Sequence, residues 1–237
     1  MLKGWVRGVF TMFVVLIATG VAVEGQTDVA VSLYGAFSGT TSTGSNNEVV
    51  SPSNAAGGMI ELRHINNPLV GYEATYSFNR ANQADSYQFN PPVGACPVNL
   101  LPCGVTTGSA PVPANAHEIA GNWLFSLKLS HLRPFALAGA GVLFDVPASG
   151  STTETYTSCA LMNPLCQTST VSVPTQSQTK AVFVYGAGVD WALSTHMGLR
   201  LQYRGNLYKA PALLSGFPSF NRLAHTAEPI LGAYFRF

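Results

Sequence analysis

Four cysteines form two pairs with the same spacing. Cys96 and Cys103 enclose CPVNLLPC, and Cys159 and Cys166 enclose CALMNPLC. Both pairs lie in stretches rich in Ser, Thr and Pro. Cysteines that bind a metal are normally closer together and have His or further Cys nearby. Two local disulfides in an oxidising compartment therefore fit this spacing better than a metal site, with free thiols as the alternative.

Five histidines are the residues with which an enzyme would activate a nucleophile. They are His64, His117, His131, His196 and His225. Nucleophilic catalysis needs a nucleophile beside a base, and a third group that orients the base. No Ser-His-Asp order or related motif surrounds any of these histidines. We therefore expect no catalytic residue. We also expect no cofactor or metal site, because the chain lacks a phosphate-binding loop and a metal-ligand cluster.

Strands are the elements that must position these residues. Eight segments alternate apolar and polar side chains with the period of two that is typical of a β-strand. Each is close to the roughly 9–11 residues that a tilted strand needs to cross a bilayer. In residues 134–145 both faces are apolar, so the sequence leaves their orientation open. The eight segments are residues 27–38, 58–65, 69–79, 117–129, 134–145, 180–191, 198–208 and 225–237.

The connections between these segments alternate between long and short. The long ones are rich in Gly, Ser, Thr, Asn and Pro. Barrels that span the outer membrane have short periplasmic turns and long outer loops, and this order places both chain ends on the periplasmic side. The long connections are residues 39–57, 79–116, 146–179 and 209–224, and the short ones are residues 66–68, 130–133 and 192–197.

Composition supports crossing a membrane with strands. The chain has 237 residues, of which 47% are hydrophobic and 10% charged, with a formal net charge of +1. Soluble domains carry roughly 25% charged residues. Beyond the N-terminus no apolar run reaches the roughly 18 residues of a membrane-spanning helix. The near-neutral charge argues against a nucleic-acid partner.

The N-terminus has the order of a secretory signal. Lys3 and Arg7 precede an apolar stretch at residues 9–23, and small residues follow. This order is typical of a signal peptide, and the apolar part is short for a retained anchor, which is the alternative. We therefore predict a signal peptide at residues 1–25 and a mature domain at residues 26–237.

A β-sheet that crosses the hydrocarbon of a membrane must close into a barrel. Backbone groups there must pair within the protein, and only helices and closed barrels achieve that. We therefore predict an all-β protein, an antiparallel up-and-down transmembrane β-barrel of about eight strands with an N-terminal signal helix. About eight strands leave an interior that side chains fill, and inward charges of both signs can pair there. The predicted lumen charges are Glu61, Arg63, Glu73, Glu118, Lys128, Asp190, Arg200, Arg204, Glu228 and Arg236.

Several of these segments resemble the bacterial outer-membrane β-barrel domain family, the OmpA-like small barrels. The resemblance implies an outer-membrane location, contact with outer-membrane lipids, and a last strand that is read by the outer-membrane assembly machinery. Phe235 and Phe237 would carry that assembly signal. The matching stretches are GYEATYSF (71–78), HEIAGNWLF (117–125), PFALAGAGVLF (134–144), GAGVDW (186–191), GLRLQYRG (198–205) and HTAEPILGAYFRF (225–237).

Function is less well defined than fold. The main hypothesis is a monomeric, non-enzymatic platform whose disulfide-clipped outer loops contact an extracellular ligand. A narrow pore lined by the inward charges is one alternative. A lipid-modifying small-barrel enzyme, using His117 or His225 with a loop Ser, is another. A soluble secreted β-sandwich fits poorly, because the outward faces are too continuously apolar for water.

Overall fold

The computed structural model describes residues 25–42, 49–89, 106–159, 166–215 and 222–237. The predicted signal peptide, apart from residue 25, lies outside the described residues, and so do Cys96 and Cys103. Within the described ranges, no helix has the length and apolarity needed to cross a membrane.

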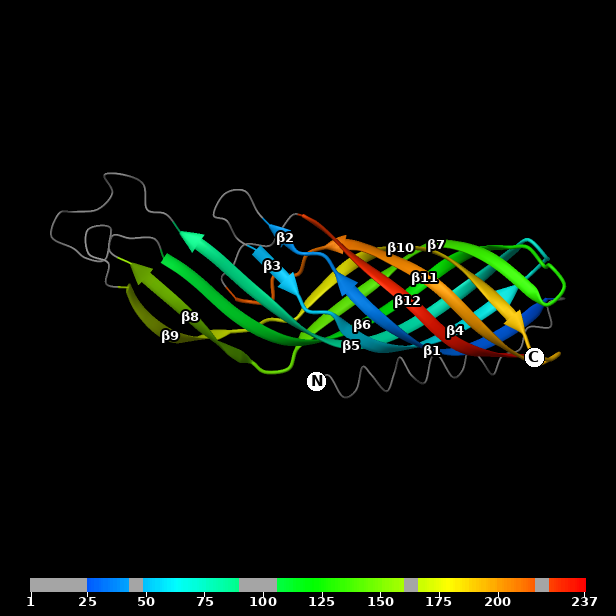
Figure 1. Ribbon diagram of the computed structural model, residues 1–237, viewed down its shortest axis with the longest axis horizontal. Helices are drawn as coiled ribbons and strands as arrows, with labels where there is room; N and C mark the ends of the chain where they lie inside the picture. Colours follow the sequence, from blue (N-terminus) through cyan, green and yellow to red (C-terminus); the bar gives the residue numbers. More distant parts are fainter. Residues whose placement is uncertain (1–24, 43–48, 90–105, 160–165, 216–221) are drawn as a thin grey trace.

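Twelve β-strands form a single sheet within the described residues (Figure 1). Their bounds are β1 (Gln26–Ser38), β2 (Thr41–Ser42), β3 (Val49–Pro52), β4 (Ala55–Ile65), β5 (Val70–Phe89), β6 (Thr106–Ser126), β7 (Leu132–Pro147), β8 (Ser151–Cys159), β9 (Cys166–Pro174), β10 (Gln178–Ala192), β11 (Met197–Lys209) and β12 (Leu223–Arg236).

Eight of these strands close into a barrel. Going round the wall, the order is β1, β4, β5, β6, β7, β10, β11 and β12, and each strand is antiparallel to its neighbours. The first and last strands complete the circle, with Val31 opposite Ala233. The predicted eight-stranded antiparallel barrel is therefore confirmed, and each of its eight strands has a paired neighbour on both sides, as hydrocarbon requires.

Alternation along each strand sorts side chains between lumen and lipid. In β1, for example, Asp28 and Ser32 are buried, whereas Val31 and Leu33 are exposed. The orientation that the sequence left open in β7 is settled by the structure. Its odd-numbered residues point inward, so that Phe135 is buried in the lumen.

Tight turns join the strands at one end of the barrel. Asn67 Oδ1 accepts hydrogen bonds from the backbone N–H groups of Leu69 and Val70, at 3.0 and 2.9 Å. Ser194 Oγ accepts in the same way from Met197 N at 3.1 Å. Such local side-chain bonds replace ladder bonds in turns.

Pro229 lies inside β12, where its missing N–H removes one ladder bond. The barrel accommodates it with a local interruption. The β1–β12 ladder runs through Tyr34 opposite Ile230 and resumes at Phe37 opposite Ala227, with no pairing between these points. The ladder on the other side of β12 is continuous.

The long connections are more structured than we predicted. Residues 79–116 were expected to be a loop, but β5 continues to Phe89 and β6 begins at Thr106, paired with each other throughout. The β8–β9 hairpin joins the outer end of β6, and the β2–β3 hairpin joins β5. As Figure 1 shows, these strands extend well beyond the barrel on the side away from the short turns. The expectation of irregular loops was wrong here, because β5 and β6 satisfy each other's backbone groups outside the membrane as well.

Candidate functional site

The barrel interior is the candidate site. In the half nearer the short turns, buried ion pairs connect the strands. Arg63 on β4 contacts Glu73 Oε2 with Nη2 at 2.6 Å and Asp190 Oδ2 with Nη1 at 2.7 Å. All three residues are at most 2% exposed. Because β4 and β10 lie on opposite walls of the barrel, the contact with Asp190 spans the lumen.

A second arginine repeats this arrangement from β11. Arg200 contacts Asp190 Oδ1 with Nε at 2.8 Å and Glu61 Oε2 with Nη1 at 2.5 Å. Ser32 Oγ donates to the other oxygen of Glu61 at 2.6 Å. The guanidinium of Arg63 also lies 4.2 Å from the centre of the Phe135 ring. Buried charges persist only when paired and hydrogen-bonded in this way.

A smaller polar group lies further toward the outer end. Arg204 pairs with Glu118, and its Nε is 3.9 Å from Glu228 Oε2. Asn206 Nδ2 donates to both carboxylates, at 2.9 Å to Glu118 and 3.1 Å to Glu228. This group therefore holds two carboxylates around one guanidinium.

Most of the predicted lumen residues lie in these two groups, and two do not. Arg236 is only partly buried and pairs with Asp28 at 3.3 Å, where β1 begins and β12 ends. Lys128 follows the end of β6 and is exposed, so its prediction as a lumen charge was wrong. The alternation of β6 ends with the strand at Ser126 and does not reach Lys128.

Sequence reasoning missed several inward polar residues. Asp28 shares a face with Ser32 and could have been found from the alternation of β1. Asn122 Nδ2 donates to Glu73 Oε1 at 3.3 Å, and it lies on the inward face of β6. Arg133 and Asp145 lie on β7, where the apolar sequence hid the orientation.

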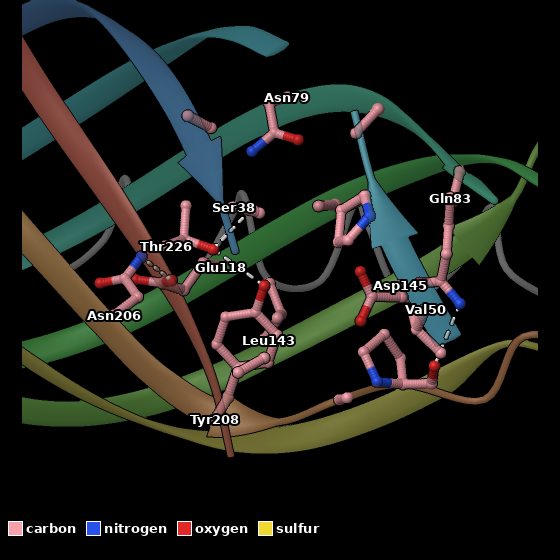
Figure 2. Close-up of a pocket in the computed structure, with 18 of the residues that line it drawn as sticks. Ser38, Val50, Asn79, Gln83, Glu118, Leu143, Asp145, Asn206, Tyr208 and Thr226 are labelled. Atoms are coloured by element: carbon pink, nitrogen blue, oxygen red, sulfur yellow. Dashed lines mark hydrogen bonds between the residues drawn. The ribbon is translucent and has the colours of Figure 1, made fainter. Parts of the chain in front are cut away.

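A cavity of about 70 Å³ lies next to the polar group of Arg204, Glu118 and Glu228, toward the outer end of the barrel (Figure 2). Glu118 of β6, Asp145 of β7 and Asn206 and Tyr208 of β11 are among the residues that line it, and Figure 2 shows their side chains around the same space. The Tyr208 hydroxyl shares a hydrogen bond of 2.9 Å with Thr226. Cavities of this size hold on the order of five waters.

Residues 210–214 close the outer end of the cavity, and all of them are buried. Their backbone is held by glutamines: Gln83 Nε2 donates to Pro211 O at 3.1 Å, and Gln176 Nε2 donates to Ala212 O at 3.2 Å. Leu213 and Leu214 pack in a cluster with Ala110, Val112 and Ala114 of β6. The segment after β11 is therefore a plug that packs across the outer end of the cavity with apolar contacts.

Asp85 is a buried acid outside the membrane-spanning part. It lies on the outer extension of β5 and accepts a hydrogen bond of 2.8 Å from Gln83 Nε2. Desolvation by burial raises the pKa of Asp85 to about 6, although the bond from Gln83 opposes the shift.

Four of the five histidines contact hydroxyl groups. His117 Nδ1 shares a hydrogen bond of 2.9 Å with the Tyr76 hydroxyl, and His225 Nε2 shares one of 2.9 Å with the Tyr185 hydroxyl. His64 Nδ1 lies 3.0 Å from Thr27 Oγ1. In the described part of the chain, no group of three His, Cys, Asp or Glu residues is placed to hold a metal ion.

Comparison with solved structures gives low sequence identity. Ail of Yersinia pestis is 14% identical, with a TM-score of 0.44, 90% of this chain covered and 99% of that one. OprG of Pseudomonas aeruginosa is 10% identical, with a TM-score of 0.49, 90% of this chain covered and 96% of that one. Neisserial surface protein A is 12% identical, with a TM-score of 0.42, 90% of this chain covered and all of that one. No curated protein sequence matches the chain.

The family comparison is decisive. Residues 10–222 match the family described as outer membrane protein beta-barrel domain, which is most of the 237-residue chain. The match agrees with a closed wall whose lipid-facing side chains are apolar and whose buried charges lie inside. The chain therefore belongs to the outer membrane protein beta-barrel domain family, and its place is the bacterial outer membrane.

Proposed function

We propose that this barrel is a monomeric, non-enzymatic platform that presents an extracellular binding surface. One observation supports this most strongly: two separate groups of residues occupy the interior. These are the ion pairs around Arg63 and Arg200 and the plug at residues 210–214. A filled lumen leaves little room for conduction. The outer extension is then the part of the molecule free to contact other molecules.

The β8–β9 hairpin is the most prominent part of this surface. Most residues of β9 are exposed, and its outer edge has no further strand beside it in the described sheet. The two strands are rich in Ser and Thr, and Thr157 and Thr168 share a hydrogen bond of 3.0 Å across them. Exposed segments held on a rigid scaffold are common binding sites.

Disulfides at the loop tips are part of the proposal. The backbone register places Cys159 directly opposite Cys166 at the end of β8–β9. Opposed residues in antiparallel strands have Cα atoms roughly 4.5–5.5 Å apart, which lies in the range that a disulfide needs. We extend the proposal to Cys96 and Cys103 by their equal spacing in the sequence.

Processing and assembly complete the proposal. Residues 1–25 would be removed during export, leaving a mature domain at residues 26–237. Phe235 and Phe237 are exposed on the lipid-facing side of the C-terminal end, and we propose that they are read by the assembly machinery. N-terminal sequencing of the mature protein should begin near Gln26.

Adhesion of whole cells tests the platform. Cells carrying the full chain are compared with cells in which residues 152–173 are replaced by Asn-Gly, for attachment to immobilised glycosaminoglycans and matrix proteins. Both proteins should migrate faster on gels before boiling, as folded barrels do, and only the full chain should support attachment. Equal attachment by two folded proteins would overturn the proposed role.

Planar-bilayer recording tests the alternative of a narrow pore. The full chain should show no conductance steps at neutral pH. Stable ion conductance from the purified, folded protein would favour the pore over the platform.

A further inference from the structure

Acidic and basic side chains occupy different positions in this protein. Every Asp and Glu side chain that the structure describes is buried. These residues are Asp28, Glu61, Glu73, Asp85, Glu118, Asp145, Glu154, Asp190 and Glu228. The exposed charged side chains in the described ranges are all cationic, and they are Arg80, Lys128, Lys209 and Arg222. The described outer surface therefore carries positive charge with no carboxylate beside it.

One exposed cation lies on the β5–β6 wall above a hydrogen-bonded histidine. Arg80 lies opposite Asn115, and Phe78, two residues earlier on the same outward face, lies opposite His117. The His117 ring is held by the Tyr76 hydroxyl and lies 4.9 Å from the Phe78 ring, centre to centre. The result is a cation just beyond an aromatic and imidazole group on the lipid-facing wall.

The same arrangement recurs on the β11–β12 wall. Lys209 lies opposite Leu223, and Leu207 lies opposite His225. The ring of Tyr185 lies over Gly205, where any Cβ would meet it, and so reaches across β11 to hydrogen-bond His225. Arg222 adds a second exposed cation next to Leu223.

Both groups lie at the outer membrane interface. Arg80 is ten residues along β5 from Val70, and Lys209 is twelve residues along β11 from Met197. Ten to twelve tilted strand residues rise about 25 Å, which is the height of the apolar band of an outer-membrane barrel. The hydrogen-bonded Tyr and His groups lie just below, at the level where aromatic girdles are found.

We propose that these two groups, Arg80 with His117 and Lys209 with Arg222 and His225, bind phosphate groups on lipids of the outer leaflet. Arginine and lysine are the residues that bind phosphate, and long cationic side chains reach from an apolar wall to the headgroups. An adjacent carboxylate would compete for these cations, and the structure describes none on this surface. The inference rests on the outer-membrane location and is independent of the proposed platform role.

Lipid-dependent thermal stability tests the proposal. The folded full-length protein in uncharged detergent is titrated with bisphosphorylated lipid A, with dephosphorylated lipid A and with inorganic phosphate. The midpoint of unfolding is followed by gel mobility, and lipid affinity by isothermal titration calorimetry. We expect bisphosphorylated lipid A to raise the midpoint by several degrees, and the other two additions to leave it nearly unchanged.

Matched variants locate the effect. The triple variant R80Q/K209Q/R222Q should bind bisphosphorylated lipid A at least tenfold more weakly, whereas K128Q, at the periplasmic end, should bind as the unmodified chain does. If the triple variant does not fold, the single variants R80Q and K209Q are measured instead, each with an expected loss of about threefold.

Three outcomes would overturn the proposal. The first is equal binding by the triple variant and the unmodified chain. The second is an equal loss in K128Q, which would indicate general charge attraction. The third is an equal effect from dephosphorylated lipid A or inorganic phosphate, which would indicate acyl-chain contact or a site for free anions.

Discussion

Removal of one arginine from the lumen should destabilise the whole barrel. Arg63 forms contacts of 2.6 Å to Glu73 and 2.7 Å to Asp190, and no water-exposed position is available to the carboxylates left behind. Breaking a buried ion pair by removing one partner costs about 3–5 kcal/mol, because the other charge stays buried. We therefore expect Arg63→Met to lower the free energy of unfolding by about 3–5 kcal/mol.

Two companion variants separate charge from shape. Arg63→Lys keeps the charge but cannot contact both carboxylates with one planar group, so we expect a loss of about 1.5–3 kcal/mol. Arg63→Met combined with Glu73→Gln removes one charge of each sign and leaves Asp190 paired with Arg200. This double variant should be more stable than Arg63→Met alone, by about 2 kcal/mol.

Urea unfolding in phospholipid vesicles measures these differences. Trp123 and Trp191 face the lipid and report unfolding through their emission. The reasoning would be refuted if Arg63→Met unfolded within 1 kcal/mol of the unmodified chain (about a fivefold change in the equilibrium constant), or if the second substitution gave no recovery.

Three further predictions concern the outer part. Peptide mapping without reductant should recover Cys159 and Cys166 as one linked peptide, and closing so short a loop should stabilise the hairpin by about 2.5 kcal/mol. Because burial raises the pKa of Asp85 to about 6, its contribution to stability is greatest below its unfolded pKa of about 4 and is lost as pH rises through 6. Hydrogen-exchange protection of β5 beyond Asp85 should therefore fall between about pH 4 and pH 6. The variant Asp85→Asn should remove this pH dependence. Leu213→Glu should loosen the plug and increase protease cleavage there, yet give no conductance, because the Arg63–Asp190 pair still blocks the lumen.

Alternation alone predicts the barrel wall well. The inward positions of Glu61, Arg63 and Arg200 follow from parity, since a lipid-facing wall forces the polar face inward. The partner of each charge cannot be read in this way. Arg63 meets Asp190, 127 residues away, only because the closed wall brings β4 and β10 face to face.

Outside the membrane, alternation of apolar and polar residues predicts the strands less well. The outer extension of β6 still alternates buried and exposed residues, but its buried residues Ala110, Val112 and Ala114 are small and its exposed face is not apolar as it is next to lipid. Pro111 and Pro113 also lack the N–H groups that a strand normally uses. Both prolines lie on the stretch of β6 between its pairing with β8 and its pairing with β7, where no ladder bond is required on that side. The plug at residues 210–214 is held by glutamines from distant segments, so no local sequence pattern predicts it.

Direct linkage of the first and last strands tests closure of the barrel, the central claim. In a chain whose four native cysteines are replaced by serine, Val31→Cys and Ala233→Cys should form a disulfide on mild oxidation in the membrane, because the two residues lie opposite each other. The control pair Ile60→Cys and Ala233→Cys, which has β1 between its strands, should stay reduced. A linked control pair together with an unlinked Val31–Ala233 pair would contradict the closed barrel.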